Sequence, residues 1–238
     1  MKLFPKNVNF LSTKRCLNGG QNLANFENYN LAMHVNDRQD RVLENRSILK
    51  DYYQLPSDPV WINQTHSSIC VDASSVSGII EADASFTLNP GVVCAILTAD
   101  CLPVFVSKKD GSMVGIAHAG WKGLISGVIE SLIKSFQCNG SDLVVHLGPA
   151  ISKNYFEVGF EIKDLYLSKN ISFARSFSLY RDKCYLDLYD AAKVILESFN
   201  ITLISGGDRC TFKETDEFFS YRRDGINSGR MAHLIWIR

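Results

Sequence analysis

The sequence predicts an α+β fold, with mixed β-sheets flanked by helices in a single domain that spans residues 1–238. Two patterns support this prediction. Short apolar runs bounded by Gly, Pro, Asp and Asn indicate strands, whereas apolar residues three and four positions apart in other segments indicate helices. The two kinds of segment do not alternate regularly, which argues against a repeated βαβ architecture. The chain of 238 residues is long enough to bury a substantial core, and it contains no repeat or linker that would mark a domain boundary.

Five apolar runs predict the main strands. Four of them are short and uninterrupted, which is typical of strands buried on both faces: 92–97 (VVCAIL), 103–106 (PVFV), 113–117 (MVGIA) and 143–147 (LVVHL). Residues 108–112 (KKDGS) have the composition of a turn, and they predict a hairpin between the second and third of these strands. A final strand is predicted at 231–237 (MAHLIWI).

Three segments carry apolar residues at helical spacing. The first is Asp37 to Tyr53, and Arg46 falls on its apolar stripe together with Val42 and Leu49. The second follows His118, where apolar residues from 124 to 136 fit one face of a single helix. The third runs from Leu188 to Phe199, with Asp187 as the candidate N-cap.

Positive and negative charges balance along the chain. Lys and Arg together number 25, as do Asp and Glu, so no global field attracts nucleic acid or an anionic membrane. Hydrophobic residues make up 46% and charged residues 21%, as in an ordinary globular protein. We therefore expect a small-molecule substrate and neither nucleic acid nor membrane as a partner. A monomer is favoured, although the sequence leaves the oligomeric state open.

The amino terminus and the cysteines predict a cytoplasmic protein. Residues 1–20 hold too short an apolar run for a signal peptide, and no stretch approaches the roughly 18 to 20 apolar residues that a membrane helix needs. The seven cysteines are odd in number and scattered, mostly within apolar runs, which indicates buried reduced thiols rather than a disulfide framework. Cys101 is the exception, because polar Asp100 precedes it and Pro103 follows closely.

Three residues form a candidate metal site: His66, Cys101 and His118. Two neutral imidazoles and a thiolate suit Zn²⁺, and three protein ligands leave a fourth position free for water or substrate, as in catalytic zinc sites. The ligands are 35 residues (66 to 101) and 17 residues (101 to 118) apart, unlike the close pairs of structural zinc knuckles. They would therefore converge only through the tertiary fold.

An arbitrary Cys/His pair is more often an ordinary part of the core, but the surroundings here favour function. Asp100 beside Cys101 is the candidate catalytic carboxylate, either as a general base or as a partner that orients a ligand. Cys101 and His118 lie at the ends of two predicted strands, where a scaffold commonly displays catalytic groups. His34, His146 and His233 lie in apolar runs, and we expect structural roles for them.

Several residues are candidates for binding phosphate or another part of a substrate. The turn Gly120, Trp121, Lys122, Gly123 leads into a predicted helix, and its free N–H groups and lysine could hold an anion. Arg46 is either a guanidinium that points inward and grips an anion or one that reaches the surface. Arg222 and Arg223 offer the same choice. Either both are solvated, or one of them points into a pocket and is held in place by Asp224.

The chain resembles a known family in a series of motifs. These are, in order, NLAMHVND (30–37), NQTHSS (63–68), LTADCLPVFV (97–106), GIAHAGWKG (115–123), LGPAIS (147–152) and FFSYRRDGINSGRMAHLIWI (218–237). In them the chain is similar to the laccase-domain family, once labelled polyphenol oxidases and now regarded as zinc-dependent purine nucleoside phosphorylases that also deaminate adenosine. The resemblance covers nearly the whole chain, and its Cys-to-His block is highly specific.

The resemblance implies a fold and a metal site. The family's ligands correspond to His66, Cys101 and His118, and its fold is α+β and related to the cysteine-hydrolase domain of a bacterial deamidating toxin. The chain departs from the family pattern in two motifs, since the family usually has Val-His-Gly where this chain has Thr65-His66-Ser67, and Arg where it has Lys122. Neither departure removes a ligand. Copper is not expected, because five histidines with one Cys-His pair cannot supply the several copper centres of a multicopper oxidase.

The activity implied by the resemblance is phosphorolysis of purine nucleosides (adenosine, inosine, guanosine and, as a further candidate, methylthioadenosine) to free base and ribose 1-phosphate. It would use one zinc ion per chain, with inorganic phosphate as co-substrate and adenosine deamination as a second activity. Two alternatives stay open. In one, Cys101 and His118 are the nucleophile and base of a cysteine hydrolase. In the other, the protein is a non-catalytic nucleotide-sensing or cell-wall-quality module.

Overall fold

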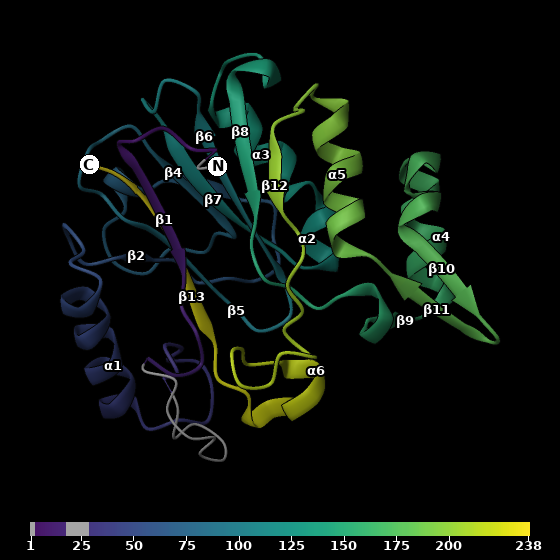
Figure 1. The fold of residues 1–238 in the computed structure, drawn as a ribbon, viewed down its shortest axis with the longest axis horizontal. Helices are drawn as coiled ribbons and strands as arrows, with labels where there is room; N and C mark the ends of the chain where they lie inside the picture. Colours follow the sequence, from purple (N-terminus) through teal and green to yellow (C-terminus); the bar gives the residue numbers. More distant parts are fainter. Residues whose placement is uncertain (1–2, 18–28) are drawn as a thin grey trace.

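Two mixed β-sheets face each other at the centre of the computed structural model, which describes residues 3–17 and 29–238 (Figure 1). The smaller sheet has the strand order β1 (Val8–Ser12), β13 (Met231–Ile237), β5 (Cys94–Thr98), β2 (Val60–Trp61). The larger has the order β12 (Ile204–Gly206), β8 (Leu143–Leu147), β6 (Leu102–Lys108), β7 (Val114–Ala119), β4 (Ala84–Thr87), β3 (Cys70–Asp72). The predicted α+β class with mixed sheets is confirmed, because each sheet combines parallel and antiparallel pairs.

Side chains alternate across both sheets, so every central strand contributes to two apolar layers. Ile96 and Ile235 of the smaller sheet meet Phe105 of the larger one in the layer between the sheets. The intervening residues face outward, as Leu97 and Val104 do, and they are buried under helices and loops. This double burial explains why these strands are continuous apolar runs in the sequence.

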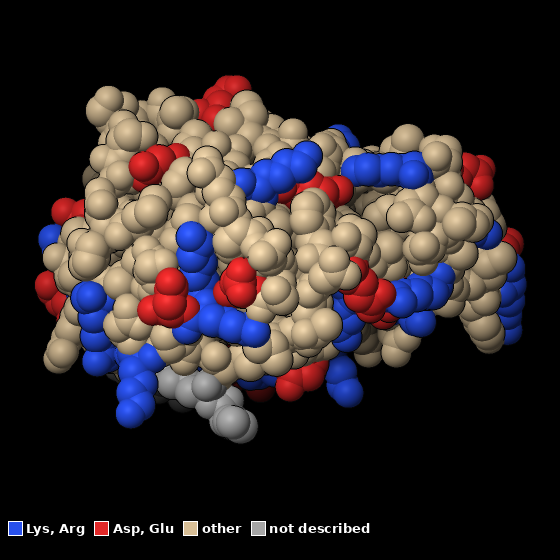
Figure 2. All heavy atoms as spheres, turned by 90° about the horizontal axis from the view of Figure 1, so that it is seen from above, with Lys and Arg blue, Asp and Glu red and all other residues tan. Residues whose placement is uncertain are grey.

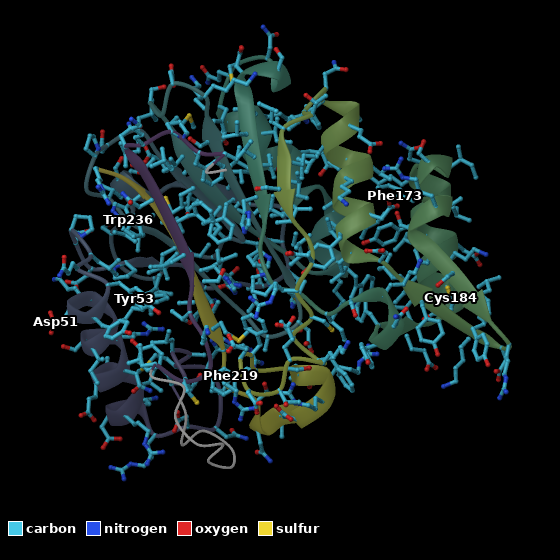
Figure 3. All side chains as sticks on the ribbon, in the orientation of Figure 1. Asp51, Tyr53, Phe173, Cys184, Phe219 and Trp236 are labelled. Atoms are coloured by element: carbon cyan, nitrogen blue, oxygen red, sulfur yellow. The ribbon has the colours of Figure 1, made fainter. Side chains whose placement is uncertain are left out.

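Helices cover the outer face of each sheet. Helix α1 (Gln39–Tyr52) and the segments next to it cover the smaller sheet, where Tyr53 and Trp236 belong to one apolar cluster (Figure 3). Helices α3 (Val128–Ser135) and α5 (Leu188–Ser198) cover the larger sheet. The order of layers is therefore helix, sheet, sheet, helix.

A smaller lobe projects beside α5 at the right of Figure 1. It is built from a three-stranded antiparallel sheet and one helix: β9 (Glu157–Val158), β10 (Phe177–Tyr180), β11 (Lys183–Leu186) and α4 (Phe160–Lys169). Phe173 and Cys184, labelled in Figure 3, are buried in this lobe. The remaining elements are short: α2 (Trp121–Ser126), α6 (Tyr221–Asp224) and the 3₁₀ turns η2 (Ala73–Ser75), η3 (Gly140–Asp142), η4 (Lys153–Tyr155), η5 (Ile171–Ser176) and η6 (Gly225–Asn227).

Most of the predicted elements are confirmed. The runs at 143–147 and 231–237 are β8 and β13, and the hairpin around residues 108–112 joins β6 to β7. The run predicted at 92–97 begins as a strand only at Cys94 and continues to Thr98. Helix α5 starts after Asp187, whose side chain accepts a hydrogen bond from the Asp190 amide at 3.1 Å.

The single helix predicted after His118 is wrong in one respect, because Gly127 divides it. Gly127 has φ +94°, outside the helical region, and its amide donates to the carbonyls of Gly123 and Leu124 at the end of α2. Helix α3 then starts at Val128 with four buried apolar residues on its inner face. The apolar spacing is nearly continuous across the break, which is why the sequence pattern conceals it.

Charged side chains of both signs are interspersed on the face seen in Figure 2. Within the described residues no helix is long and apolar enough to cross a bilayer. The amino-terminal stretch discussed for a signal peptide, residues 1–20, includes 1–2 and 18–20, which lie outside the described residues.

Candidate metal centre and its cavity

The fold brings His66, Cys101 and His118 together at one edge of the two sheets. Their ligand atoms all lie within 4.8 Å of one another, and the two imidazole rings have centroids 4.7 Å apart. Cys101 occupies the turn where the chain leaves β5 in one sheet and enters β6 in the other, whereas His118 lies in β7 and His66 in the loop between β2 and β3. Three converging N and S donors at this spacing fit a tetrahedral Zn²⁺ with one open position.

Asp83 connects two of the three donors. Its Oδ1 atom lies 2.8 Å from His118 Nδ1, and its carboxylate accepts backbone amides of Thr65, His66 and Ser67 at 2.6 to 3.1 Å. The Ser67 hydroxyl donates to Asp83 as well, at 2.7 Å. His66 has φ +60°, so these contacts hold a strained residue in place. A carboxylate on Nδ1 leaves His118 Nε2 to face the other donors, the usual arrangement behind a zinc-bound histidine.

Neighbouring charges shift the pKa values of His118 and Asp83 in opposite directions. Burial alone would lower the pKa of His118, but the Cys101 thiolate and the Asp83 carboxylate outweigh it and raise that pKa to about 9. The hydrogen bonds from His118 and Ser67 in turn outweigh burial at Asp83 and lower its pKa to about 2. Asp83 is thus a fixed negative charge, completely shielded from solvent, directly behind the donors.

Gly120 keeps the space beside the donors open. A Cβ atom at this position would lie 2.8 Å from Cys101 Sγ and 3.0 Å from His66 Nδ1. Any side chain would therefore displace the donors. The glycine that the sequence suggested as part of an anion-binding turn has a second role here, because it lets β7 and α2 pass close to the sulfur.

Asp100 is buried beside Cys101, but both of its carboxylate oxygens have partners. Oδ1 accepts from Thr211 Oγ1 and Oδ2 from the Arg222 amide, each at 2.6 Å. Its φ of +91° is unusual for a residue other than glycine and turns the chain sharply from β5 into Cys101. The carboxylate lies at the wall of the cavity described below, and these bonds connect the Cys101 turn to α6.

A cavity of about 600 Å³ opens over the three donors. This volume lies within the range of about 300 to 1,000 Å³ that is typical of small-molecule sites. Its wall combines the donors with three aromatic rings, an imidazole and two cationic side chains. The rings are Trp121, Phe156 and Tyr221, the imidazole is His34, and the cationic groups are Arg222 and Arg230. The aromatic surfaces could pack against a planar ring, and the cationic groups could bind an anion.

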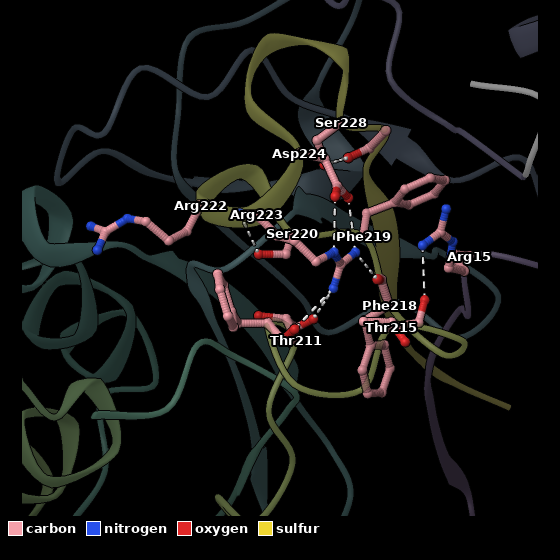
Figure 4. Close-up of polar contacts among 12 residues, drawn as sticks. Arg15, Thr211, Thr215, Phe218, Phe219, Ser220, Arg222, Arg223, Asp224 and Ser228 are labelled. Atoms are coloured by element: carbon pink, nitrogen blue, oxygen red, sulfur yellow. Dashed lines mark hydrogen bonds and ion pairs between the residues drawn. The ribbon is translucent and has the colours of Figure 1, made fainter. Parts of the chain in front are cut away.

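The two adjacent arginines of α6 have different roles (Figure 4). Arg223 forms a bidentate pair with Asp224, and its guanidinium also donates to the carbonyls of Thr211, Phe212 and Phe218. Arg222 points away from that network and lines the cavity, where it donates to the carbonyls of Tyr155 and Glu157 at 3.2 and 3.1 Å. Asp224 therefore fixes the arginine that faces away from the cavity.

Three other phosphate candidates, Arg46, Lys122 and Gly123, lie outside the cavity wall. Arg46 stacks on Trp61, with its guanidinium carbon 4.1 Å from the ring centroid, and its Nε donates to the Leu31 carbonyl at 2.9 Å. Burial lowers the pKa of Arg46 to about 10, because its charge is partly removed from water. Lys122 is exposed and lies 5.5 Å from the Trp121 ring centroid, and Gly123 is packed against the His118 carbonyl.

Comparison with known families decides the classification. The model of a family described as multi-copper polyphenol oxidoreductase laccase matches residues 10–238. The chain belongs to this laccase-like family. The resemblance read from the sequence motifs is thereby confirmed.

Curated relatives and solved structures of the laccase-like family extend over the whole chain. A protein named purine nucleoside phosphorylase YfiH from Escherichia coli is 40% identical over 237 residues, covering 98% of this chain and 95% of its own. A purine nucleoside phosphorylase from Haemophilus influenzae is 38% identical, with the same coverage. Among solved structures, Neisseria meningitidis protein NMB0706 aligns with a TM-score of 0.92 at 39% identity, covering 100% of this chain and 97% of its own.

Three site residues of this laccase-like protein were not predicted from its sequence: Asp83, Arg230 and a cavity-lining His34. Asp83 meets His118 only through the pairing of β4 with β7, in which Ala84 lies opposite Ala117. Arg230 precedes β13, and only the pairing of that strand with β5 brings it near Cys101. His34 and Arg230 both occur within the quoted motifs, so the motifs were the available signal for them.

Proposed function

We propose that this protein cleaves purine nucleosides by phosphorolysis at a zinc-dependent site. The observation that carries the proposal is the preformed group of His66, Cys101 and His118, which opens into a cavity of small-molecule size with aromatic and cationic walls. The names of curated relatives with about 40% identity over the whole chain support the same reaction class. A multicopper oxidase is disfavoured, because the described residues assemble one group of three or more such donors rather than several.

The reaction breaks the bond between C1′ of ribose and the purine nitrogen. An oxygen of phosphate forms a new bond to C1′, the electron pair of the broken bond leaves with the base, and the base takes up a proton. The products are free purine and ribose 1-phosphate. The transition state resembles an oxocarbenium ion, so a site gains rate by placing the oxyanion close to C1′ and stabilising the departing base.

The residues of this chain divide these tasks. His66, Cys101 and His118 would hold zinc, which when bound supplies a Lewis-acid centre at the cavity floor. Asp83 would orient His118 through Nδ1, and Trp121, Phe156 and Tyr221 would enclose the planar base. Arg222 and the other cationic group of the wall would attract phosphate. The alternative is that phosphate binds at one of the other candidates from the sequence, which are Arg46, Gly120, Lys122 and Gly123.

The decisive assay is a nucleoside panel incubated with zinc-loaded protein, with and without phosphate, and analysed by mass. We expect free base and ribose 1-phosphate only when phosphate is present. The Cys101→Ala variant should release hypoxanthine from inosine far more slowly than the parent. An equal rate in this variant would overturn the zinc-site proposal, and ligand-induced thermal stabilisation without turnover would point to the non-catalytic module instead.

A cysteine hydrolase is the second candidate, and one observation favours it. Cys101, His118 and Asp83 follow one another as thiol, imidazole and carboxylate, which is the order of a nucleophile, its base and an orienting group. His66 has no role in such a triad but completes a metal site. Metal analysis with iodoacetamide labelling separates the two: stoichiometric zinc and slow alkylation would exclude the hydrolase, whereas rapid alkylation of metal-free purified protein would support it.

Adenosine deamination is proposed as a second activity of the same site. In this reaction water replaces the amino group at C6 of adenine and ammonia leaves, so a carboxylate must move a proton. Asp100 is the candidate, although the structure gives its two oxygens hydrogen-bond partners in Thr211 and Arg222. Formation of inosine from adenosine by the parent, and its loss in Asp100→Asn with phosphorolysis of inosine retained, would support this assignment.

A further inference from the structure

Arg230 is the cationic residue of the cavity that the sequence did not single out. It immediately precedes β13, whose Met231 pairs with Thr98 of β5, so it lies beside the strand that leads to Cys101. Its Nη1 donates to the carbonyls of Ser228 and Gly229 at 2.6 and 3.0 Å. Within the described residues it forms no ion pair and no hydrogen bond through Nε or Nη2. Two of its donor groups are therefore available to a ligand.

Arg230 shares its part of the cavity with the ring of Tyr221 and the imidazole of His34. Tyr221 lies under the guanidinium, with its ring centroid 5.6 Å away, and burial lowers the pKa of Arg230. His34 lines the same cavity, and its pKa is lowered first by burial and then by Arg230, Arg46 and His118. Asp100, the nearest wall carboxylate, directs both oxygens at Thr211 and the Arg222 amide.

Arg222 is less available than Arg230 for an anion. Its guanidinium already donates from both terminal nitrogens to the carbonyls of Tyr155 and Glu157, and it lies 5.1 Å from the Phe156 ring centroid. Lys122 does not line the cavity. Arg230 has a planar guanidinium with two free donors and lines the same cavity as the imidazole of His34, so it suits the oxygens of a tetrahedral oxyanion better than Arg222 or Lys122 does.

We propose that Arg230 and His34 form the subsite that binds inorganic phosphate, at the end of the cavity next to the Cys101 turn. This subsite rests on the proposed phosphorolysis, and it identifies where inorganic phosphate, the co-substrate of that reaction, binds. Phosphate bound there lies in the same cavity as the donor group, so a nucleoside between them has its ribose next to the oxyanion. His34 contributes as a neutral hydrogen-bond donor and Arg230 as the charge.

The experiment compares single variants of the zinc-loaded full-length protein. Inorganic phosphate is titrated by calorimetry, and KM for phosphate and for inosine is measured separately. Arg230→Gln should weaken phosphate binding and raise KM for phosphate about ten- to a hundredfold, as expected for a lost charge-assisted contact, while KM for inosine changes little. His34→Gln should act in the same direction, by about two- to tenfold.

Two further variants separate the loss of the Arg230 contact from general effects of charge and folding. Arg181→Gln removes an equal charge from the exposed turn between β10 and β11 and should leave phosphate binding unchanged. Because Arg230 also bonds two backbone carbonyls, Arg230→Lys serves as a second variant that retains the charge; it should fold with the parent's unfolding temperature and bind phosphate more tightly than Arg230→Gln. The subsite is wrong if Arg230→Gln binds phosphate like the parent, or if Lys122→Gln weakens binding more than Arg230→Gln does.

Failure of the subsite is distinguishable from failure of the proposed function. Phosphorolysis that proceeds with an unchanged KM for phosphate in Arg230→Gln would reject the subsite alone. Phosphate binding that depends on Arg230, without turnover of any nucleoside, would reject phosphorolysis and keep the subsite. A purine nucleoside 5′-monophosphate that binds through Arg230, while inorganic phosphate fails to bind at all, would overturn the assignment to free phosphate.

Discussion

A single carboxylate accounts for much of the order around the three donors. Asp83 receives three backbone amides of the loop that carries His66 and also contacts the ring of His118 in β7. Two of the candidate metal donors, which come from different elements, are therefore positioned by one negative charge that has no contact with solvent. Such partners fix the orientation of an imidazole and raise its basicity, which strengthens metal binding.

Replacing Asp83 with Asn should reduce zinc affinity without unfolding the protein. The amide has the same shape but lacks the charge and offers one acceptor oxygen in place of two, so His118 loses its electrostatic partner. We expect zinc to bind about 10- to 100-fold more weakly, measured by competition with a chromogenic chelator. Asp110→Asn in the exposed β6–β7 turn is the matched control. An affinity within twofold of the parent would show that Asp83 is structural only.

At the scale of elements, the sequence pattern predicted those strands and helix ends that interactions between neighbouring residues determine. The apolar run at 231–237 became β13 residue for residue, and the Asp187 side chain caps α5 as expected. The lobe of β9, β10, β11 and α4 was not predicted, because its strands are short and its helix has a mixed polar surface with only Tyr166 fully buried. The break at Gly127 was also missed, since a glycine within helical spacing has no unique meaning in a sequence.

The Gly127 break provides a test of backbone conformation. An alanine Cβ there would meet nothing closer than 3.7 Å, so the expected cost of Gly127→Ala is conformational rather than steric. With φ at +94°, we expect the free energy of unfolding to fall by about 1 to 2 kcal/mol, measured by urea denaturation. Ser126→Ala, one residue earlier at the end of α2, should change it by less than about 0.5 kcal/mol. Equal stabilities of the two variants would contradict this account.

His233 on β13 provides a pH-dependent test of the layer between the sheets. Its side chain is fully buried, with Nε2 at 2.8 Å from Thr98 Oγ1 and Nδ1 at 2.7 Å from Ser12 Oγ. Burial, with a smaller contribution from His118, lowers the pKa of His233 to about 3. In the unfolded chain a histidine has a pKa of about 6.5, so acid favours the unfolded state here.

The direction of this pH dependence follows from the linkage between proton binding and unfolding. The stability contribution is complete above pH 6.5 and is lost as pH falls from 6.5 towards 3, because only the unfolded chain takes up the proton. Between pH 7 and pH 5 this residue should remove about 2 kcal/mol from the free energy of unfolding. His233→Gln cannot take up that proton, and its stability should decline less steeply over the same interval. Parallel urea-denaturation profiles for parent and variant would disprove the assignment.

At the scale of the whole molecule, the candidate metal centre lies where the two sheets are joined. The chain crosses from one sheet to the other at Asp100 and Cys101, and His118 lies in the strand that faces this crossing. Ligand chemistry and motifs sufficed to predict that His66, Cys101 and His118 would converge, as the structure bears out. Asp83 and Arg230 could not be found in that way, because their places depend on pairings between distant strands.

A metal at this junction should stabilise the entire fold, since it would tie the loop of His66 and a strand of the larger sheet to the crossing turn. Zinc that binds only the native state contributes about 2.7 kcal/mol at a free concentration 100 times its Kd, which for a chain of this size is a rise in Tm of about 5 to 10 °C. We expect this rise in the parent and its reversal by a chelator. Cys101→Ala should lose the zinc-dependent rise, whereas Cys138→Ala, a cysteine outside the donor group, should keep it. If zinc raised the Tm of Cys101→Ala as much as that of Cys138→Ala, the ion would be binding elsewhere, and the junction of the two sheets would be held by packing alone.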